Sequence, residues 1–394
     1  AGAPAAPCLA IPPEAATLPA GTNPEGPWLA PGGRLMATLG TNRVVPGFPT
    51  DVAVHPDGHV AYITSAGPRE RSLMVVDLMS FETLQHIERS NAFYGLEAGK
   101  KGKWLYASGG ASNQVERYPI AEDGTLGDGE ALETGGYPSG LALDPQSTRL
   151  WVGLFVDEAL VEIDLETWTE TRRVDIPAGV WDVVFVPQYD ELYASDLVGG
   201  GIAVVDSHAW ELLDMLDVPT SPAGMAVSDD GAKVWAAVSG SDAIATIDTT
   251  EKMISDWTTV GDLEWVDDEG VPLPNSNVNS LWHDPMNNRL YASRGADNSV
   301  GVFNADTMEV EGVIPTSWYP TDVELVPQRN LLVISEGKGG GAGPNEGQGG
   351  KERLKGSLSF VEINDLVLES ATALAKENYG RPSTVFPFEC EGDF

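Results

Sequence analysis

The stretch Phe48-Pro-Thr-Asp-Val-Ala-Val-His-Pro-Asp-Gly58 joins a short apolar strand to a tight-turn sequence, and this combination recurs along the chain. Clear copies are Tyr137-Pro-Ser-Gly-Leu-Ala-Leu-Asp-Pro145 and Tyr319-Pro-Thr-Asp-Val-Glu-Leu-Val-Pro327. Alignment on the second residue gives seven copies, spaced by 41 to 57 residues, at Pro49, Tyr94, Pro138, Trp181, Pro222, Asn279 and Pro320. Repeats of about 40–45 residues built only of strands are typical of β-propellers, with one four-stranded sheet per blade. The sequence therefore predicts an all-β, seven-bladed β-propeller.

Each copy continues with the same order of strands. The inner strand is almost continuously apolar, as in Val183-Val-Phe-Val186, which is typical of a strand buried on both faces. The second strand ends in small residues, as in Trp104-Leu-Tyr-Ala-Ser108, and the third ends in Asp, as in Leu160-Val-Glu-Ile-Asp164. We expect this Asp to cap the hairpin that follows, which is a structural role.

Composition divides the chain into three parts. Residues 1–33 are rich in Pro, Ala and Gly and form an arm without periodicity. The segment Arg34–Leu39 is predicted to be the outer strand of the seventh blade, so the propeller would span residues 34–368 and be closed by an N-terminal strand. Residues 369–380 contain helix formers and end in Gly, which predicts one short helix within the C-terminal part, 369–394.

The chain is strongly acidic, with 23 Lys and Arg against 59 Asp and Glu and a formal net charge of −36. Such a surface repels phosphate backbones and anionic lipids, so neither nucleic-acid binding nor membrane-surface binding is expected. It suits divalent cations, cationic partners or a saline exterior, or it is only a solvating coat. No run of 18 apolar residues occurs, so no membrane span is predicted.

The two ends of the sequence favour a location outside the cytoplasm. The opening Ala1-Gly-Ala-Pro-Ala-Ala-Pro7 is typical of a chain already processed by a signal peptidase. The two cysteines, Cys8 and Cys390, lie one in each tail. Because the termini of a ring-closed propeller meet, we expect a Cys8–Cys390 disulfide rather than two free thiols, and hence a secreted, periplasmic or cell-surface protein.

Two insertions interrupt the repeat, around Asp256–Asn275 and at Gly337–Gly350. Strands alternate in direction, so the loop before each inner strand and the loop between the second and third strands emerge on one face. We call this the mouth face, because the central channel of the propeller opens there. Insertions gathered on one face usually mark the working face, so we expect function at the mouth.

The repeat resembles that of the bacterial YVTN-type seven-bladed propellers. Three further segments are similar to the propeller half of bacterial propeller–phosphoesterase fusion proteins: Ser108-Gly-Gly-Ala-Ser-Asn-Gln-Val-Glu-Arg-Tyr118, Trp318-Tyr-Pro-Thr-Asp-Val323, and the glycine-rich loop through Asn345 with Lys355-Gly-Ser-Leu-Ser359. In those fusions an alkaline-phosphatase-like domain follows the propeller, and no such domain follows it here before Phe394. The resemblance implies a secreted or periplasmic propeller without the phosphoesterase activity.

Sequence motifs of catalysis are mostly missing. Neither Gly-x-Ser-x-Gly nor Cys-x-x-Cys occurs, and the glycine-rich loop lacks the Lys-Ser/Thr pair and the context of a P-loop. The five histidines are scattered. His55 and His59 flank one turn on the face opposite the mouth, where two ligands make a weak case for a metal.

Acidic residues at the start of inner strands form the better group of candidates. Asp51, Asp182 and Asp322 occupy a position that is Gly95, Gly140, Gly224 or Ser280 in the other blades. Seven such positions ring the channel mouth, so the three carboxylates could share one space. Their repulsion would raise a pKa or attract a hard cation such as Ca²⁺ or another divalent metal. Alternatively, each only accepts hydrogen bonds from nearby backbone amides.

Aromatic residues lie beside these acids. The collar consists of Phe48, Phe93, Tyr94, Tyr137, Trp181, Trp318 and Tyr319. Such rings suit a cationic or amphipathic ligand, or they wedge neighbouring blades together. With Lys338 and Asn345 of the glycine-rich loop, Tyr94, Tyr137, Trp181, Trp318 and Tyr319 complete the predicted ligand-binding residues.

Three functions remain open. The favoured one is a non-enzymatic propeller outside the cytoplasm that binds a ligand or protein partner at its mouth face. The second is a hydrolase or lactonase-like enzyme that uses a metal held by the channel acids. The third is a subunit that docks a separately encoded enzyme.

Overall fold

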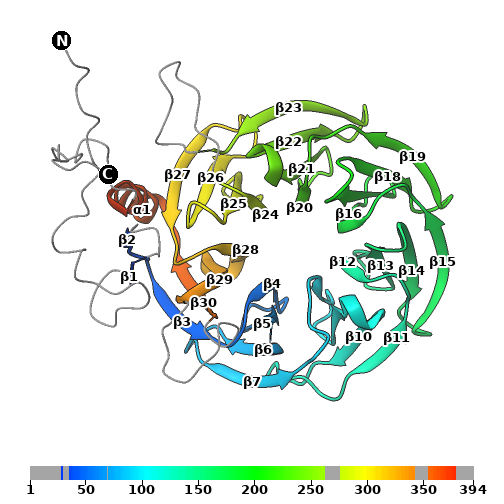
Figure 1. Cartoon of the computed structure of the whole chain (residues 1–394), viewed down its shortest axis with the longest axis horizontal. Helices are drawn as coiled ribbons and strands as arrows, with labels where there is room; N and C mark the ends of the chain where they lie inside the picture. Colours follow the sequence, from blue (N-terminus) through cyan, green and yellow to red (C-terminus); the bar gives the residue numbers. More distant parts are fainter. Residues whose placement is uncertain (1–27, 30–34, 69, 262–275, 342–353, 379–394) are drawn as a thin grey trace, which may run out of the picture.

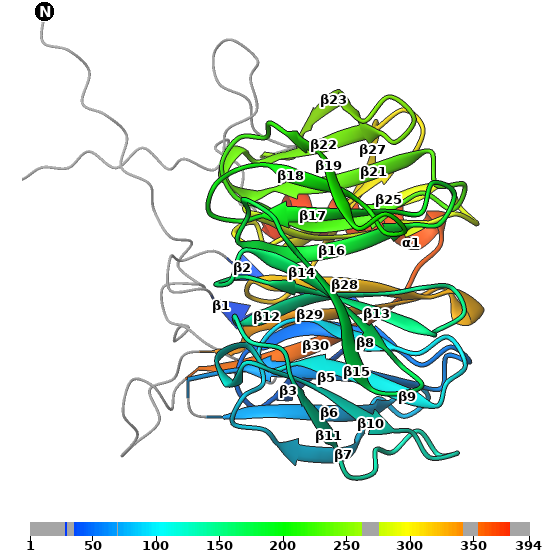
Figure 2. The same ribbon diagram turned by 90° about the vertical axis from the view of Figure 1, so that its right-hand side faces the viewer.

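The computed structural model describes residues 28–29, 35–68, 70–261, 276–341 and 354–378. Seven four-stranded antiparallel sheets surround a central axis like the blades of a propeller (Figure 1). Seen from the side, the ring is a thick disc with blades 4 and 5 at one end of the view and blades 1 and 2 at the other (Figure 2). The predicted all-β, seven-bladed propeller is confirmed.

The strands of each blade follow one another from the axis outward. The first four blades are β4 (Pro49–Val54), β5 (Val60–Ala66), β6 (Arg71–Asp77) and β7 (Thr83–Glu88); β8 (Leu96–Ala98), β9 (Trp104–Ser108), β10 (Gln114–Pro119) and β11 (Glu130–Glu133); β12 (Pro138–Leu143), β13 (Arg149–Leu154), β14 (Ala159–Asp164) and β15 (Thr169–Asp175); and β16 (Val180–Val186), β17 (Glu191–Asp196), β18 (Ile202–Asp206) and β19 (Glu211–Leu216).

The last three blades keep this order, and the seventh takes its outer strand from the N-terminal side. They are β20 (Pro222–Val227), β21 (Lys233–Val238), β22 (Ala243–Asp248) and β23 (Met253–Thr259); β24 (Val278–Asp284), β25 (Arg289–Arg294), β26 (Ser299–Asn304) and β27 (Val310–Pro315); and β28 (Pro320–Val326), β29 (Leu331–Gly341), β30 (Lys355–Glu362) and β3 (Thr41–Val45).

An N-terminal strand closes the ring, as predicted, but the segment expected to do so was wrong. The closing strand is β3, which pairs antiparallel with β30, whereas Leu35–Met36 (β2) pairs with Trp28–Leu29 (β1). Gly40 separates the two segments with a φ of +73°, and a side chain there would overlap the Phe360 carbonyl. The strand escaped prediction because only Val45 of its five residues is buried, so it lacks an apolar pattern.

A buried carboxylate holds this closure together. Glu336, on β29, is completely buried and accepts hydrogen bonds from the Ser317 amide (2.8 Å) and the Ser359 hydroxyl (2.7 Å). Its second oxygen accepts from the Asn42 side chain of β3 (3.1 Å) and from the Ser357 hydroxyl. One side chain therefore joins three separate segments of blade 7, and the hydrogen bonds to both of its oxygens offset the cost of burying this polar group.

Apolar side chains fill the spaces between neighbouring blades. One cluster joins Val52 and Met74 of blade 1 to Val333 and Phe360 of blade 7. Further clusters occupy the spaces between other pairs of blades. The inner strands are thus packed on both faces, which explains their nearly continuous apolar sequence.

The helix α1 (Asp365–Asn378) packs outside the ring against β27 (Figure 1). Its buried residues are Leu368, Ala371 and Ala375. It begins four residues before the predicted start, because the Asn364 side chain accepts a hydrogen bond from the Val367 amide and caps the first turn.

The recurrent Asp at the end of third strands caps a hairpin, as predicted. The Asp77 carboxylate accepts hydrogen bonds from the amides of Met79 (3.0 Å) and Ser80 (2.6 Å). Asp164 and Asp206 bind the amides that follow them in the same way. These acids therefore have a structural role.

Substitution of Glu336 by Gln should lower the free energy of unfolding by roughly 1–3 kcal/mol. The variant replaces one of the two carboxylate oxygens, which together accept four hydrogen bonds, by an NH2 group that cannot accept any. Urea denaturation measures this loss. The control is Glu362→Gln on the neighbouring strand, whose ion pair with Arg329 is exposed and should contribute less than about 1 kcal/mol. Equal effects of the two changes would show that the buried carboxylate does not hold the closure.

Candidate functional site

The first residues of the seven inner strands form two stacked rings around the axis. In the structure, Pro49, Val180 and Val278 occupy equivalent positions. Each pairs with a residue at the end of the second strand of its blade, just before a bulge. The sequence alignment is therefore one residue out in blades 2, 4 and 6. The mouth ring, as we call it, is Thr50, Tyr94, Ser139, Trp181, Ala223, Asn279 and Thr321; the acid ring beneath it is Asp51, Gly95, Gly140, Asp182, Gly224, Ser280 and Asp322.

Above the acid ring lies a cavity of about 450 Å³, which we call the mouth cavity. Four aromatic side chains line it: Phe48, Tyr94, Trp181 and Tyr319. The rest of the lining is neutral and is contributed by Thr50, Leu197, Ser221, Ala223, Ser239, Gly240, Asn277, Asn279 and Thr321. A concave apolar site with a few polar groups of this kind is the usual form of a small-molecule pocket.

The predicted aromatic collar divides into two groups. Tyr94 stacks on Trp181, with centroids 4.8 Å apart and an interplanar angle of 20°. Phe93 packs edge-on against Tyr137 at 4.8 Å. Among the described residues that line the mouth cavity, Tyr94 and Trp181 are present and Tyr137 is not. Tyr137 instead packs against Phe93, which packs edge-on against Trp181 at 5.6 Å.

The second aromatic group already holds a cation. The Lys338 ammonium lies 4.4 Å from the centroid of Tyr319 and 5.4 Å from that of Trp318. Tyr319 also faces Phe48 at 6.2 Å and lines the cavity, whereas Trp318 does not appear in the described lining. The structure thus brings these predicted residues together, with Lys338 on the part of β29 that was expected to be a loop.

Residues at the rim are held in an unusual backbone conformation. Tyr137, Ser221, Asn277 and Tyr319, each just before an inner strand, have φ between +48° and +66°. Non-glycine residues seldom adopt this region, and such strain clusters at functional sites.

The preceding blade anchors three of these rim residues. The Asn113 side chain accepts from the Tyr137 amide (3.1 Å), and Asn298 accepts from the Tyr319 amide (3.0 Å). Asp242 accepts from the Asn277 amide at 2.7 Å. The mouth is therefore a built surface, fixed from blade to blade.

Below the mouth cavity the channel contains a second cavity of about 190 Å³, the channel cavity. Asp51, Asp182 and Asp322 all line it, so the three predicted acids face one space. Tyr94 is the one described residue that lines both cavities, and it lies between them.

Each acid also bridges to the next blade. Asp51 accepts hydrogen bonds from the Leu96 amide (2.8 Å), and Asp182 accepts from the Met225 amide (2.8 Å). Asp322 accepts from the Val52 amide at 2.9 Å. The backbone-binding alternative is therefore observed, together with convergence on the channel.

The channel makes these carboxyl groups hard to ionise. Burial and the neighbouring Asp322 carboxylate raise the pKa of Asp51 well above its usual range. Burial raises the pKa of Asp182 to about 7, although the Met225 and Val183 amides oppose this. Burial also raises the pKa of Asp322, which shares a hydrogen bond with Asp51. Burial and the Asp182 charge raise the pKa of Tyr94 well above its usual range.

Two further acids, Glu97 and Glu324, were missed. Each stands two residues after a member of the acid ring, and both line the channel cavity with Lys100. Burial raises the pKa of Glu97, and burial with the Asp322 charge raises that of Glu324 well above its usual range. The period of two along a strand, as in Asp322-Val-Glu324, could have revealed them.

The described residues include one close group of potential metal ligands, and it lies outside the channel. In the part of the chain that the structure describes, the one group of three or more potential ligands within 4.8 Å of one another is His55, Asp57 and His59. The predicted role of Asp51, Asp182 and Asp322 as metal ligands, and the ligand-binding role of the mouth residues, stay predictions.

Several predicted residues lie outside the described segments. They are Cys8 and Cys390 of the expected disulfide and Asn345 of the glycine-rich loop. Most of both insertions, 262–275 and 342–353, also falls outside. Trp257, placed in the first insertion from the sequence, belongs to β23.

Stability should fall as the pH rises from about 4 to about 7, because the folded channel retains protons that the unfolded chain releases in this range. Asp182→Asn should remove part of this slope, at most about 1.4 kcal/mol per pH unit, the value for one proton. The variant should therefore gain stability relative to the unsubstituted chain as the pH rises.

Urea denaturation at a series of pH values tests this prediction. The control is Glu211→Gln, an exposed acid on β19, which should leave the slope unchanged. A slope that is the same in Asp182→Asn and in the unsubstituted chain would contradict the raised pKa.

No helix among the described residues is long and apolar enough to cross a membrane. No protein-family model matches the sequence. The chain is 24% identical over 211 residues to the uncharacterized protein YncE of Salmonella typhimurium, covering 52% of this chain and 59% of that protein. It is 23% identical over 242 residues to antigen Lp49 of Leptospira interrogans, covering 59% of this chain and 48% of the antigen. The matches thus span about half the length of these relatives.

Solved structures of propellers superpose over most of the chain. Hydrazine synthase of Kuenenia stuttgartiensis matches with a TM-score of 0.62 at 16% identity, over 74% of this chain and 93% of that one. A streptogramin B lyase matches with a TM-score of 0.61 at 12% identity, over 82% and 98%. The WD40 repeats of RRP9 give 0.66 at 12% identity, over 83% and 100%. At such identities the likeness shows the fold alone: the protein is a seven-bladed β-propeller.

Proposed function

We propose that this propeller binds a small amphipathic organic cation at its mouth face and that it acts as a binding protein, not as an enzyme. The observation that carries the proposal is the position of the aromatic mouth cavity directly above a channel that contains five carboxyl groups. The apolar body of the ligand would occupy the mouth cavity, and its positive end would face the acids.

The aromatic lining supports the first half of this proposal. Trp181 and Tyr94 form a stacked pair on one side of the cavity, and Tyr319 and Phe48 face each other from other blades. Aromatic rings attract cations by about 0.5–2 kcal/mol each, more when water is excluded. The Lys338 ammonium on Tyr319 shows that one of these rings accommodates a positive charge.

The acids support the second half. Among the described residues lining the channel cavity, Lys100 is the one basic side chain beside Asp51, Glu97, Asp182, Asp322 and Glu324. The net charge of −36 adds a long-range attraction for cations. A cation at the mouth would favour ionisation of the acids and so relieve part of their burial penalty.

The enzymatic alternative rests on one observation: the buried carboxyl groups of Asp51 and Asp322 are neighbours, and both accept a hydrogen bond from the Val52 amide. Two carboxyl groups that share a proton can act as acid and base in hydrolysis. This makes a hydrolase or lactonase-like activity that uses the channel acids the second candidate. Docking of a separate enzyme, or of another protein, at the mouth face is the third.

We also propose that the protein functions outside the cytoplasm and that it belongs with the YVTN-type propellers related to the propeller–phosphoesterase fusions. The repeat and the acidic composition support this placement. The two cysteines provide its test.

Calorimetric titration with aromatic and alkyl trimethylammonium ions should detect binding, with at least about tenfold lower affinity for neutral alcohols of the same shape, a difference of about 1.4 kcal/mol. Trp181→Ala should weaken the binding of the cations about tenfold. The matched control is Trp257→Ala, because Trp257 is exposed on an outer strand.

Measurement of the protons released on ligand binding distinguishes the role of the acids from that of the aromatic rings. Binding of a cation should release protons near pH 7, and Asp182→Asn should reduce both the release and the affinity. Equal affinity for the cations and the alcohols would show that the site does not recognise the positive charge of the ligand. The absence of binding by every probe, with hydrolytic activity lost in Asp322→Asn, would favour the enzyme.

Intact-mass measurement before and after reduction tests the compartment. A Cys8–Cys390 disulfide in protein isolated from its native host should appear as a mass lower by the two hydrogens lost on oxidation. Its reduction should lower the thermal stability, since closing a loop of this length stabilises by up to about 5 kcal/mol. Two thiols that react at once with an alkylating reagent would contradict an oxidising location.

A further inference from the structure

A histidine-rich turn lies on the face opposite the mouth, where the proposed function makes no use of it. The turn joins β4 to β5 and has the sequence His55-Pro-Asp-Gly-His59. Its backbone is fixed by hydrogen bonds from the His55 amide to the Val60 carbonyl (3.0 Å) and from the Gly58 amide to the His55 carbonyl (2.8 Å). Position 55 and position 59 therefore keep a constant separation.

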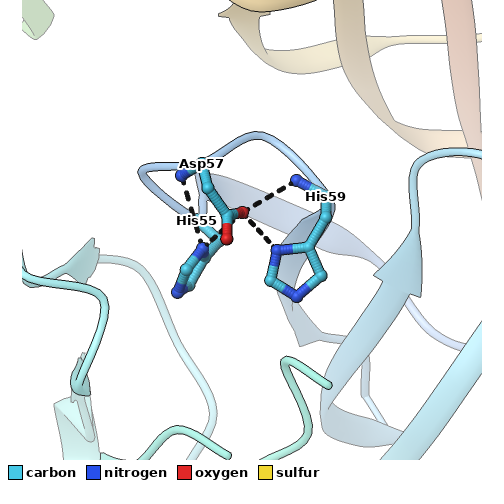
Figure 3. A group of neighbouring side chains, drawn as sticks. All are labelled: His55, Asp57 and His59. Atoms are coloured by element: carbon cyan, nitrogen blue, oxygen red, sulfur yellow. Dashed lines mark hydrogen bonds and ion pairs between the residues drawn. The ribbon is translucent and has the colours of Figure 1, made fainter. Parts of the chain in front are cut away.

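The turn brings its three chemically active side chains together (Figure 3). One oxygen of Asp57 lies 2.7 Å from Nδ1 of His55 and in contact with Nδ1 of His59. The two imidazole rings meet edge-on, with centroids 4.7 Å apart. Potential ligand atoms of all three residues lie within 4.8 Å of one another.

The environment of His55 prepares Nδ1 to act as a ligand. Nε2 of His55 lies 3.2 Å from the Gly102 carbonyl, which can only accept a hydrogen bond. When Nδ1 binds a metal ion, Nε2 carries the proton and donates it to this carbonyl. This hydrogen bond from the far nitrogen to a carbonyl is the support that metal-bound histidines usually have.

The nitrogen atoms that face Asp57 can act in two ways. With a proton on Nδ1 of each ring, both histidines donate hydrogen bonds to the Asp57 carboxylate. With Nδ1 deprotonated, the two nitrogens and a carboxylate oxygen can instead bind one metal ion.

We propose that His55, Asp57 and His59 bind one divalent transition-metal ion, with zinc as the best match. Two imidazoles and one carboxylate are typical zinc ligands, and such a set leaves coordination positions for water. Ligand atoms about 2.0–2.1 Å from zinc in tetrahedral geometry are about 3.3 Å apart. Asp57 can make this small movement, because 61% of its side chain is exposed.

A bound ion at this place would connect blades 1 and 2. All three ligands belong to blade 1, while the carbonyl that orients His55 belongs to the turn before β9 of blade 2. Gly102 itself has no room for a side chain, since a Cβ would lie 2.5 Å from Nε2 of His55. The two blades are thus already fitted to each other around the site.

Titration calorimetry with zinc on the full chain, freed of metal by a chelator, tests the proposal. Millimolar Ca²⁺ in the buffer should occupy the many surface carboxylates. We expect one equivalent of zinc to bind, and His59→Gln and Asp57→Asn each to weaken this binding by more than about tenfold, since even outer partners of a zinc ligand contribute about 10–100-fold. His208→Gln, an exposed histidine after β18, is the matched control and should bind zinc normally.

Histidine resonances provide a second measurement that does not depend on affinity. Zinc should shift the imidazole signals of His55 and His59 and leave those of His86 and His208 in place; the chain has only five histidines. Trp181→Ala should bind zinc normally, so this site can fail independently of the mouth. Binding that survives in His59→Gln, or the absence of a stoichiometric zinc ion in correctly folded protein, would overturn the proposal.

Discussion

Seven inner strands converge on one axis, and the rest of the molecule depends on how their first residues fit together there. Two solutions recur around the acid ring. At Gly140 the next blade approaches so closely that a Cβ would lie 2.5 Å from the Cα of Asp182. At Asp51, Asp182 and Asp322 a carboxylate instead reaches across to an amide of the next blade. Blades are therefore joined at the axis either by direct backbone packing or by an acidic bridge.

The acidic bridge places two opposing effects on the same carboxyl groups. Hydrogen bonds from backbone amides favour the ionised form of each carboxyl, whereas burial beside other acids favours the neutral form. For Asp182 the second effect is larger, and its pKa rises to about 7. Residues that complete the fold thus also set the electrostatic character of the channel below the aromatic mouth. The proposed binding role would therefore use the same three side chains as the structural role.

The sequence predicted the fold well because each blade repeats the same local pattern. Apolar inner strands, second strands that end in small residues and capping Asp residues recur in register, as in Trp104–Ser108 and Leu160–Asp164. The closing strand was misplaced because Asn42 and its neighbours are polar, and they are held by Glu336, which is distant in sequence. Pairings between such distant segments leave no local pattern.

The sequence predicted which residues gather at the candidate site, but not which of their side chains reach the cavity. Convergence of Asp51, Asp182 and Asp322 follows from their equivalent places in the repeat. The division of the aromatic collar does not, since it depends on side-chain directions: Trp181 lines the cavity, whereas Tyr137 packs against Phe93. Strand pairing aligns Val180 and Val278 with Pro49, so the alignment at Trp181 and Asn279 was one residue out.

The anchoring of rim residues also bears on which segment of the chain is the unit of repeat duplication. Asn113, Asp242 and Asn298 each hold the residue that leads into the following blade, always in the direction of the chain. The smallest segment that carries its own anchor is therefore not a blade. It runs from the turn before the third strand of one blade, where the anchoring residue lies, to the residue that leads into the inner strand of the next. Duplication of this offset segment would copy each clamp with its partner, whereas duplication of a whole sheet would separate them.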